Sequence, residues 1–403
     1  MASTITTKLL LLAALPLALA LPDPSPILNA RASTCTPVAG GSSSIDDVPA
    51  ITSAIASCSS GTIVIPSGTT YYLNSVLDFA GCSGCDFQVE GLLKFTSSTS
   101  YWSGKTAMIN VKNIKGLKIR SLTGKGVIDG NGQEAWDLFA SDSSYARPTL
   151  LYITGGSDIT ISNLRQKNPP NVFNSVKGGT NNIAFTSLTM DAISKSTNLP
   201  KNTDGFDINT STNVLIKNVK VTNNDDCVAF KPGANGVTVT DITCIGSHGL
   251  SVGSLGKSSS DVVKNVYVSG ATMINSTKAV GIKTYPSGGS HGQSTVSNVT
   301  WTGVVVQGCD YAIQIESCYG EDASYCAKYP GNADLSGIVF DKFSGTTSGK
   351  YGSVTGNLNC GADGTCGVKI SSYTVKAKNG GTEVLCANTP SSLGVTCTSG
   401  ASG

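Results

Sequence analysis

The sequence predicts an all-β protein whose chain winds into a right-handed parallel β-helix, a solenoid of stacked coils. A nine-residue pattern recurs, and each copy opens with a turn former and then alternates apolar and polar residues, as a half-buried strand does. The first apolar residues of the copies are Ile159, Ile183, Val214, Val237, Val266, Val299 and Ile338. Their spacings of 23 to 39 residues are too irregular for leucine-rich or helical repeats. They suit coils that carry loops of variable length.

A second strand is expected in each coil at a nearly fixed distance from the first. Cys227, Leu250, Val280 and Ala312 lie 13 or 14 residues after the leading valines of their coils. Parallel strands in successive coils would stack about 4.8 Å apart. Residues at equivalent places in successive coils then form a column on the surface, so widely separated sequence positions meet in one site.

The N-terminal residues 1–20 are expected to be a signal peptide. Lys8 precedes an apolar stretch from Leu9 to Ala20 that ends in a small-x-small pattern. This stretch is too short to span a bilayer, and no later segment reaches the roughly 18 apolar residues that a membrane helix needs. The proline-rich residues 21–31 end in Arg31 and read as a short pro-segment, with a disordered mature N-terminus as the alternative. We therefore expect a secreted, extracellular protein with no membrane partner.

A short capping helix is expected near the start of the solenoid, because the open ends of a stack expose apolar faces and unpaired strand edges. In residues 46–58, Val48, Ile51 and Ile55 share one helical face and Pro49 lies near the helix start. Two cysteine pairs after residue 360 would hold a C-terminal cap. No Pro- or Gly-rich linker divides residues 32–403, which are expected to form a single catalytic domain.

Thirteen cysteines fit a protein that folds in an oxidising compartment. Close spacing predicts the disulfides Cys35–Cys58, Cys227–Cys244, Cys318–Cys326, Cys360–Cys366 and Cys386–Cys397. Cys82 with Cys85 is a sixth, tighter candidate, and Cys309 is left over as a buried free thiol. The chain has two histidines and no pair of C-x-x-C motifs, so no metal site and no cofactor are expected.

Three N-x-S/T sequons, at Asn209, Asn275 and Asn298, predict glycosylation in a secreted chain, although each could remain unused. Charged residues make up 13% of the chain and the net charge is +2. This balance does not suggest a nucleic-acid partner. A polyanionic substrate would have to be met by locally placed lysines rather than by a global field. A monomer is expected.

Five short motifs follow the column of second strands: Asn202–Asp207 (NTDGFD), Asp225–Phe230 (DDCVAF), Gly246–Gly256 (GSHGLSVGSLG), Gly281–Pro286 (GIKTYP) and Ile315–Gly320 (IESCYG). Gly126–Trp136 (GVIDGNGQEAW) precedes them. In this order and at coil spacing, the motifs resemble glycoside hydrolase family 28, the polygalacturonases, over essentially the whole mature chain. The resemblance implies hydrolysis of the galacturonan backbone of pectin, and a pectic polysaccharide as the partner.

Three aspartates lie within about two rungs of the predicted stack. Asp204 is one coil before Asp225 and Asp226, and His248 is one coil after them. Carboxylates this close repel one another, so at least one should have a raised pKa and hold a proton. Glycoside hydrolysis needs this division, since one protonated acid serves the leaving oxygen and an ionised carboxylate serves water or direct attack.

The family resemblance implies that Asp225 is the general acid, while Asp204 and Asp226 position and deprotonate water, which gives inversion. Neighbouring rungs place carboxylates about 5 Å apart, a separation usually associated with retention. We follow the family, because water can bind beside a clustered trio. His248 is expected to hydrogen-bond the acid or the substrate and to tune protonation. Asp207 is expected at most to support the trio.

Substrate binding is expected from Asn202, Lys283, Tyr319 and the backbone position Gly281. Lys283 would bind a galacturonate carboxylate, and Tyr319 would stack on a sugar or bind a hydroxyl. Polygalacturonases carry Arg-Ile-Lys where this chain has Gly-Ile-Lys, and no arginine follows Arg165. A guanidinium binds a carboxylate through two hydrogen bonds, which a lone ammonium cannot do. We therefore expect weaker hold on bare galacturonate and more room at Gly281.

A fungal branch of the family, the endo-xylogalacturonan hydrolases, shares the GIKTYP run, Phe-Lys-Pro after the Asp pair, and Ser-Cys-Tyr-Gly. Endo attack on xylose-substituted galacturonan is therefore the expected activity. Exo-polygalacturonase activity on unsubstituted polymer is the alternative. A calcium-dependent pectate lyase and a non-enzymatic pectin-binding solenoid are weaker alternatives. The clustered aspartates argue against both, since a passive binder of polyanions gains nothing from acidic side chains in its cleft.

Overall fold

The structure is a computed structural model that describes residues 1–2 and 33–403. Apart from the first two residues, the predicted signal peptide (1–20) and pro-segment (21–31) lie outside the described part. Residues 33–403 form one compact unit. Among the described residues, no helix is long and apolar enough to cross a membrane.

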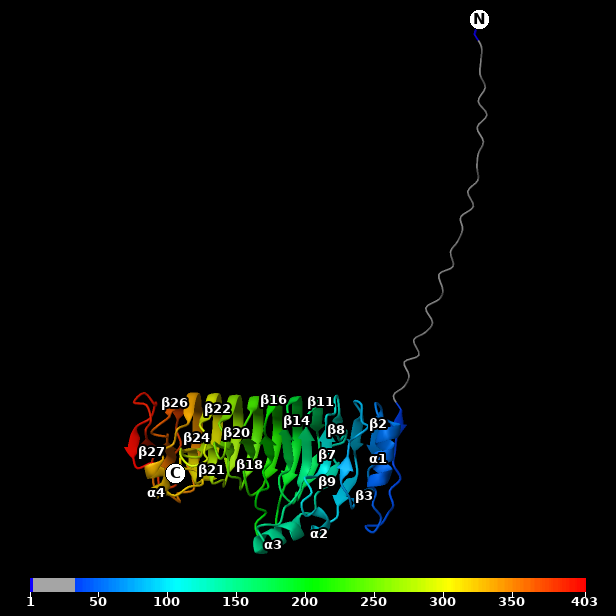
Figure 1. Cartoon of the computed structure of the whole chain (residues 1–403), viewed down its shortest axis with the longest axis horizontal. Coiled ribbons are helices and arrows are strands. Elements are labelled where there is room, and N and C mark those ends of the chain that lie inside the picture. Colours follow the sequence, from blue (N-terminus) through cyan, green and yellow to red (C-terminus); the bar gives the residue numbers. More distant parts are fainter. Residues whose placement is uncertain (3–32) are drawn as a thin grey trace. The chain divides into compact units, whose positions relative to one another are not determined.

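Two stacked sheets of parallel strands build this unit, and both run along its whole length (Figure 1). The site sheet, which carries the predicted motifs, contains β4 (Leu77–Asp78), β7 (Ala107–Lys112), β10 (Thr149–Thr154), β13 (Asn174–Lys177), β15 (Phe206–Ile208), β17 (Val228–Phe230), β19 (Leu250–Leu255), β21 (Lys278–Thr284), β23 (Tyr311–Glu316), β25 (Val354–Asn359), β27 (Glu383–Ala387) and β28 (Cys397–Ser399).

The second sheet, called here the long sheet, wraps the remaining wall of the coils. It contains β1 (Thr34–Cys35), β2 (Thr62–Ile65), β3 (Thr70–Leu73), β5 (Asp86–Val89), β6 (Leu92–Phe95), β8 (Lys118–Arg120), β9 (Val127–Asp129), β11 (Ser157–Ser162), β12 (Arg165–Lys167), β14 (Thr180–Asp191), β16 (Ser211–Thr222), β18 (Ala234–Ile245), β20 (Asp261–Ile274), β22 (Ser294–Cys309), β24 (Asp334–Thr347) and β26 (Thr365–Tyr373). The predicted right-handed parallel β-helix is confirmed.

The nine-residue pattern has the register that the sequence predicted. The seven leading apolar residues pair in one unbroken row, from Ile159 to Ile338. The turn former that opens each copy bends the chain in a left-handed conformation, with φ of 53° at Asn213 and 57° at Asn265. Asparagine and glycine enter this conformation at low cost, whereas branched residues do not. Each long strand holds two such residues five positions apart, for example Asn213 with Asn218 and Asn265 with Gly270, and they turn the strand without breaking its ladder.

The row of second strands is shifted by one residue at two of its four predicted members. Val228 and Ile313, rather than Cys227 and Ala312, pair in line with Leu250. A shift of one residue turns a side chain to the other face of a strand. The prediction was wrong there because the bend between the two strands absorbs one residue more in those coils than in the coil of Leu250.

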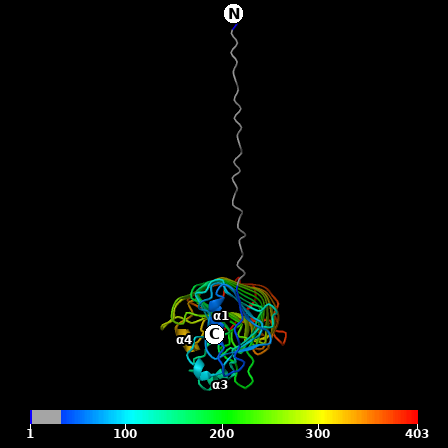
Figure 2. The ribbon, with the colours of Figure 1, turned by 90° about the vertical axis from the view of Figure 1, so that its right-hand side faces the viewer.

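The N-terminal end of the stack is covered by α1 (Val48–Ser57), as expected. Val48, Ile51 and Ile55 are buried against the first coils, and Cys58 closes the helix through a disulfide to Cys35. Viewed end-on, α1 overlies the stacked coils and α3 (Gln133–Ser141) projects below them (Figure 2). The other helices are α2 (Thr99–Trp102) and α4 (Ala323–Lys328).

All five predicted disulfides are formed, and Cys82–Cys85 is a sixth. Cys309 is the remaining cysteine of the described chain and is buried as a free thiol, as predicted. Of the three sequon asparagines, Asn275 and Asn298 are exposed and Asn209 is half-buried. Their glycosylation stays a prediction.

Candidate active site

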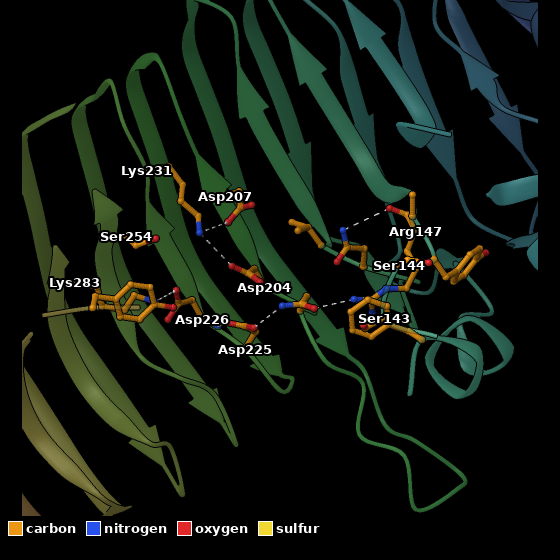
Figure 3. Close-up of a pocket in the computed structure, with 17 residues that line it drawn as sticks. Ser143, Ser144, Arg147, Asp204, Asp207, Asp225, Asp226, Lys231, Ser254 and Lys283 are labelled. Carbon is orange, nitrogen blue, oxygen red and sulfur yellow. Dashed lines mark hydrogen bonds and ion pairs between the residues drawn. The ribbon is translucent and has the colours of Figure 1, made fainter. Parts of the chain in front are cut away.

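Two loops of neighbouring coils bring three aspartates together at the edge of the site sheet (Figure 3). Asp204 lies just before β15, and Asp225 and Asp226 lie just before β17. One carboxylate oxygen of each lies within 4.8 Å of the others. Asn223 ties the two loops, because its Nδ2 donates to the carbonyl oxygens of Thr203 (2.8 Å) and Asp226 (3.0 Å). The side-chain cluster therefore rests on a fixed backbone.

Asp226 is held as a fully paired carboxylate. It is 1% exposed, its Oδ2 lies 2.7 Å from Nζ of Lys283, and its Oδ1 accepts a hydrogen bond from Oγ of Ser251 at 2.8 Å. Burial of Lys283 disfavours its charge, but the charge and hydrogen bond of Asp226 outweigh this, so the pKa of Lys283 is raised. Lys283 therefore keeps its positive charge beside the carboxylate of Asp226.

Asp225 is surrounded by donors. The backbone N–H of Asp226 donates to its Oδ1 at 2.7 Å, Nδ1 of His248 lies 3.3 Å from the same oxygen, and Nδ2 of Asn202 donates to Oδ2 at 3.2 Å. Burial raises the pKa of Asp225, but His248, the Asp226 N–H and Lys283 together lower it to about 2. The substrate-free cleft therefore favours the ionised form of Asp225.

Asp204 has the opposite tendency. Burial first, and then repulsion by Asp207 and Asp225, raise the pKa of Asp204 well above its usual value. Lys231 partly offsets this, since its Nζ lies 3.9 Å from Oδ2 of Asp204 and 3.7 Å from Oδ1 of Asp207. One carboxyl of the trio was expected to hold a proton. In the substrate-free structure this carboxyl is that of Asp204 and not that of Asp225.

The cluster opens into a groove. A hollow of about 590 Å³ extends from Arg147 and Phe139 to Lys283 and Tyr319, with the trio and Lys231 on its floor. A second hollow of about 420 Å³ shares Asp225, Lys283 and Tyr319 with the first and continues to Tyr351. The groove therefore extends to both sides of Asp225.

Comparison with known proteins identifies the family. The family model described as "Glycosyl hydrolases family 28" matches residues 56–398, which include every element of the groove. The chain belongs to this family. The family 28 glycosidase described here is 69% identical over 402 residues to "Endo-xylogalacturonan hydrolase A" of Aspergillus tubingensis, covering 98% of this chain and 99% of that protein.

A second relative and a solved crystal structure are similar over nearly the whole chain. "Probable endo-xylogalacturonan hydrolase A" of Aspergillus niger is 68% identical over 406 residues, covering 99% of this chain and 100% of that protein. The crystal structure of endo-xylogalacturonan hydrolase from Aspergillus tubingensis superposes with a TM-score of 0.92 at 72% identity, covering 92% of this chain and 100% of the crystallised one.

The groove of this family 28 member brings together seven of the eight predicted site residues. These are Asn202, Asp204, Asp225, Asp226, His248, Lys283 and Tyr319. Tyr319 packs edge-on against Tyr285, with ring centroids 5.6 Å apart, and its ring centroid lies 5.5 Å from Nζ of Lys283. The ammonium of Lys283 is itself bound to Asp226 at 2.7 Å in the substrate-free structure.

The expected extra room at Gly281 is not present. A Cβ added there would lie 2.6 Å from the carbonyl oxygen of Gln314 and 2.9 Å from Cδ of Lys278. The backbone carbonyl of Gln314 and the stem of Lys278 together fill the space beside the glycine. Nothing in the pattern of the strand indicates the direction in which this side chain leaves the backbone.

Two groove residues were missed by the sequence analysis. Arg147, on the loop between α3 and β10, donates from one guanidinium nitrogen to Oδ1 of Asn202 (2.8 Å) and from another to the carbonyl oxygen of Lys201 (2.7 Å). Its guanidinium carbon lies 3.6 Å from the ring centroid of Phe139. Lys231 belongs to the Phe-Lys-Pro run, which was noticed as a motif without a role. No repeat marks the Arg147 loop, so only the folded chain places it.

The trio is the one group of described residues whose oxygens could together hold a metal ion. Lys283 at 2.7 Å and Lys231 at 3.9 Å already balance part of its charge. Two ammonium groups beside the carboxylates would repel a cation. This donor set suits proton transfer better than metal binding.

Proposed function

We propose that this family 28 glycosidase is a secreted, monomeric endo-hydrolase of xylogalacturonan that cuts α-1,4-galacturonan linkages with inversion. The observation that carries the proposal is the aspartate trio at the middle of a groove that extends to both sides. Endo attack needs sugar to bind on both sides of the cleaved bond. The 68 and 69% identity to proteins named endo-xylogalacturonan hydrolases supports the substituted polymer as the substrate.

In the proposed reaction, Asp225 gives its proton to the glycosidic oxygen as the bond to the anomeric carbon breaks. A water held by Asp204 and Asp226 attacks that carbon from the opposite side and passes a proton to Asp226. The ammonium of Lys283 and the hydroxyl of Ser251 hold the carboxylate of Asp226 in place for this role. One proton leaves Asp225 and one arrives at Asp226, so the pair is restored by exchange with solvent.

Asp225 must gain its proton before it can act, because its pKa is about 2 in the free cleft. A galacturonate carboxylate that binds nearby is a like charge, and like charges raise the pKa of a carboxyl. The anionic substrate itself therefore favours protonation of the acid. This coupling gives an acidic activity optimum and makes neutral sugar polymers poor substrates.

Inversion is proposed although the trio is compact. Oxygens within 4.8 Å of one another are closer than the roughly 6.5–9.5 Å between the carboxyl groups of most inverting enzymes, but one water can bind against Asp204 and Asp226 together. The stereochemistry is measured by NMR at early times on a defined oligosaccharide. Release of the product with retained configuration would exclude the water-attack scheme.

The activity is tested by reducing ends released from xylogalacturonan and from polygalacturonate, with chromatography of early products to separate endo from exo attack. Asp225→Asn and Asp226→Asn should each lower turnover by roughly 10²–10⁴. Asp241→Asn is the matched control, since Asp241 is an exposed bend residue of the long sheet. Ultraviolet-absorbing unsaturated ends, or loss of activity with chelator, would indicate a lyase instead. Binding without new reducing ends would indicate a passive pectin-binding protein.

Secretion is supported by the six disulfides, which persist in oxidising compartments. It is tested by N-terminal sequencing of the protein from culture medium, which should show a start after residue 20 or after Arg31. Recovery only from cell extract would contradict it. The monomeric state is measured by light scattering of the purified enzyme.

A further inference from the structure

Lys278 lies at the start of β21 in the second hollow of the groove, beyond Asp225. It is 5% exposed, and its stem crosses two glycines of adjacent coils. A Cβ added at Gly249 would lie 3.1 Å from Cγ of Lys278, and one added at Gly281 would lie 2.9 Å from its Cδ. Because both glycines lack a side chain, the stem of Lys278 can lie flat against their backbone.

The ammonium of Lys278 is poorly paired. Its nearest carboxylate is that of Glu316, with Nζ 3.8 Å from Oε2, which is too long for a hydrogen bond. Lys283 on the same strand has a carboxylate at 2.7 Å. Burial, followed by repulsion from Lys283, lowers the pKa of Lys278. A buried ammonium without a close anion is costly, and an incoming carboxylate would relieve that cost.

We infer that Lys278 binds the carboxylate of the galacturonate residue that occupies the second hollow. It supplies there the positive charge that an arginine at position 281 would otherwise carry. This inference rests on the proposed function and deepens it. Lys283 is committed to Asp226 and Lys350 to Asp310, at 2.7 and 2.8 Å, so among the described lysines of this hollow Lys278 is the one without a carboxylate at hydrogen-bond distance. Because every galacturonate carries the carboxylate, Lys278 recognises the acid in branched and unbranched polymer alike.

The test is Lys278→Met in the full-length enzyme, which keeps the stem over the glycines and removes the charge. A charged hydrogen bond lost equally from the ground state and the transition state raises KM by about 10- to 100-fold and leaves kcat within about threefold. The rise should be the same on xylogalacturonan and on polygalacturonate. The dependence of KM on salt should also weaken, because one charge has left the binding site.

Lys342→Met is the matched control. Nζ of Lys342 also lies 3.8 Å from a carboxylate, that of Asp341, but on the long sheet outside the groove. Its KM, salt dependence and melting temperature should stay as in the wild type. Melting temperatures of all variants are measured in parallel, because a purely structural Lys278–Glu316 pair would lower stability without changing KM or its salt dependence.

A second, activity-free arm measures the Kd of a galacturonate oligomer in the Asp225→Asn background with and without Lys278→Met. The expected result is a Kd about 10- to 100-fold weaker without the ammonium. A folded Lys278→Met enzyme with KM and Kd within twofold of the wild type would overturn the inference. A fall in kcat with unchanged KM would also overturn it, because Lys278 would then act on the position or charge of the aspartates and not on substrate binding.

If Lys278→Met does not fold, Lys278→Gln takes its place, and unfolding of both overturns the binding role in favour of a structural one. Wild-type enzyme that binds the oligomer through Lys278 but releases no reducing ends from either polymer would contradict the proposed hydrolase while the inference stands. If the wild-type enzyme is active and Lys278→Met changes neither KM nor Kd, the inference fails while the proposed hydrolase stands. The two failures are therefore distinguishable.

Discussion

Replacing His248 by glutamine tests whether Asp225 is the proton donor. The imidazole Nδ1 lies 3.3 Å from Oδ1 of Asp225, and after burial it is the largest influence on the pKa of that carboxyl. Glutamine retains a donor of similar reach but removes the positive charge that a protonated ring carries. Without that charge the pKa of Asp225 should rise from about 2 toward its ordinary value of 3.8.

The size of the pKa change in His248→Gln depends on the interactions of Asp225 that the substitution leaves in place. The full difference between 3.8 and about 2 corresponds to about 2.4 kcal/mol at 1.36 kcal/mol per pH unit. The N–H of Asp226 and the charge of Lys283 still act on Asp225, so roughly half, about one pH unit, should be recovered in His248→Gln. A higher pKa keeps the acid protonated to higher pH. The alkaline limb of the profile should therefore move upward by about one pH unit.

The assay is kcat from reducing-end release across roughly pH 3 to 7, since kcat reports the groups of the enzyme–substrate complex, in which the galacturonate carboxylate has raised the pKa of Asp225. His291→Gln is the control, because His291 is the other histidine of the chain and contacts Glu321 and Tyr285 rather than Asp225. An alkaline limb that stays in place, or moves to lower pH, would refute Asp225 as the acid that sets it.

Two further perturbations follow from the groove. The pKa of Asp204 is raised in the fold, so its contribution to stability is complete below its unfolded pKa and is lost as pH rises through the folded one. Asp204→Asn should therefore raise the melting temperature at pH 7 relative to the wild type, with no gain near pH 3, while turnover falls; calorimetry showing a lower value at pH 7 would contradict this. Gly281→Ala should lower stability by about 1–3 kcal/mol through overpacking against Gln314, and Gly281→Arg should lose stability too rather than gain activity on unbranched polymer. Urea unfolding measures both, and an arginine variant as stable as the wild type would show that the coil can yield.

The coil architecture could be predicted from the sequence because the alternation of apolar and polar side chains shows which face of each strand points inward. The row from Ile159 to Ile338 and the meeting of Asp204 with Asp225 follow from that alternation and from the stacking distance. The one-residue errors at Cys227 and Ala312 arise in bends, where the chain length absorbed per turn has no periodic signal.

The chemistry of the groove was harder to predict. Which aspartate holds a proton depends on burial and on contacts of 3 to 4 Å, and these depend on side-chain directions that periodicity does not encode. Arg147 reaches the groove from a loop without a repeat. Lys278 lies over Gly281 because Gly249 in the preceding coil also lacks a side chain, and no single motif contains both glycines.

In each coil, the bent strand of the long sheet has the same length of repeat, whereas the connecting loops differ in length. Residues such as Asn213 and Gly236 form the bends, while the hydrogen-bonded pairing of parallel strands sets the height of each rung. The 23 to 39 residues between successive leading residues differ instead in the connecting loops. A loop that lines the groove, such as the one with Arg147, can therefore become longer or shorter without moving the aspartates. In such a scaffold, changes in the loops can alter which branched polymers fit the groove, while the aspartates keep their positions.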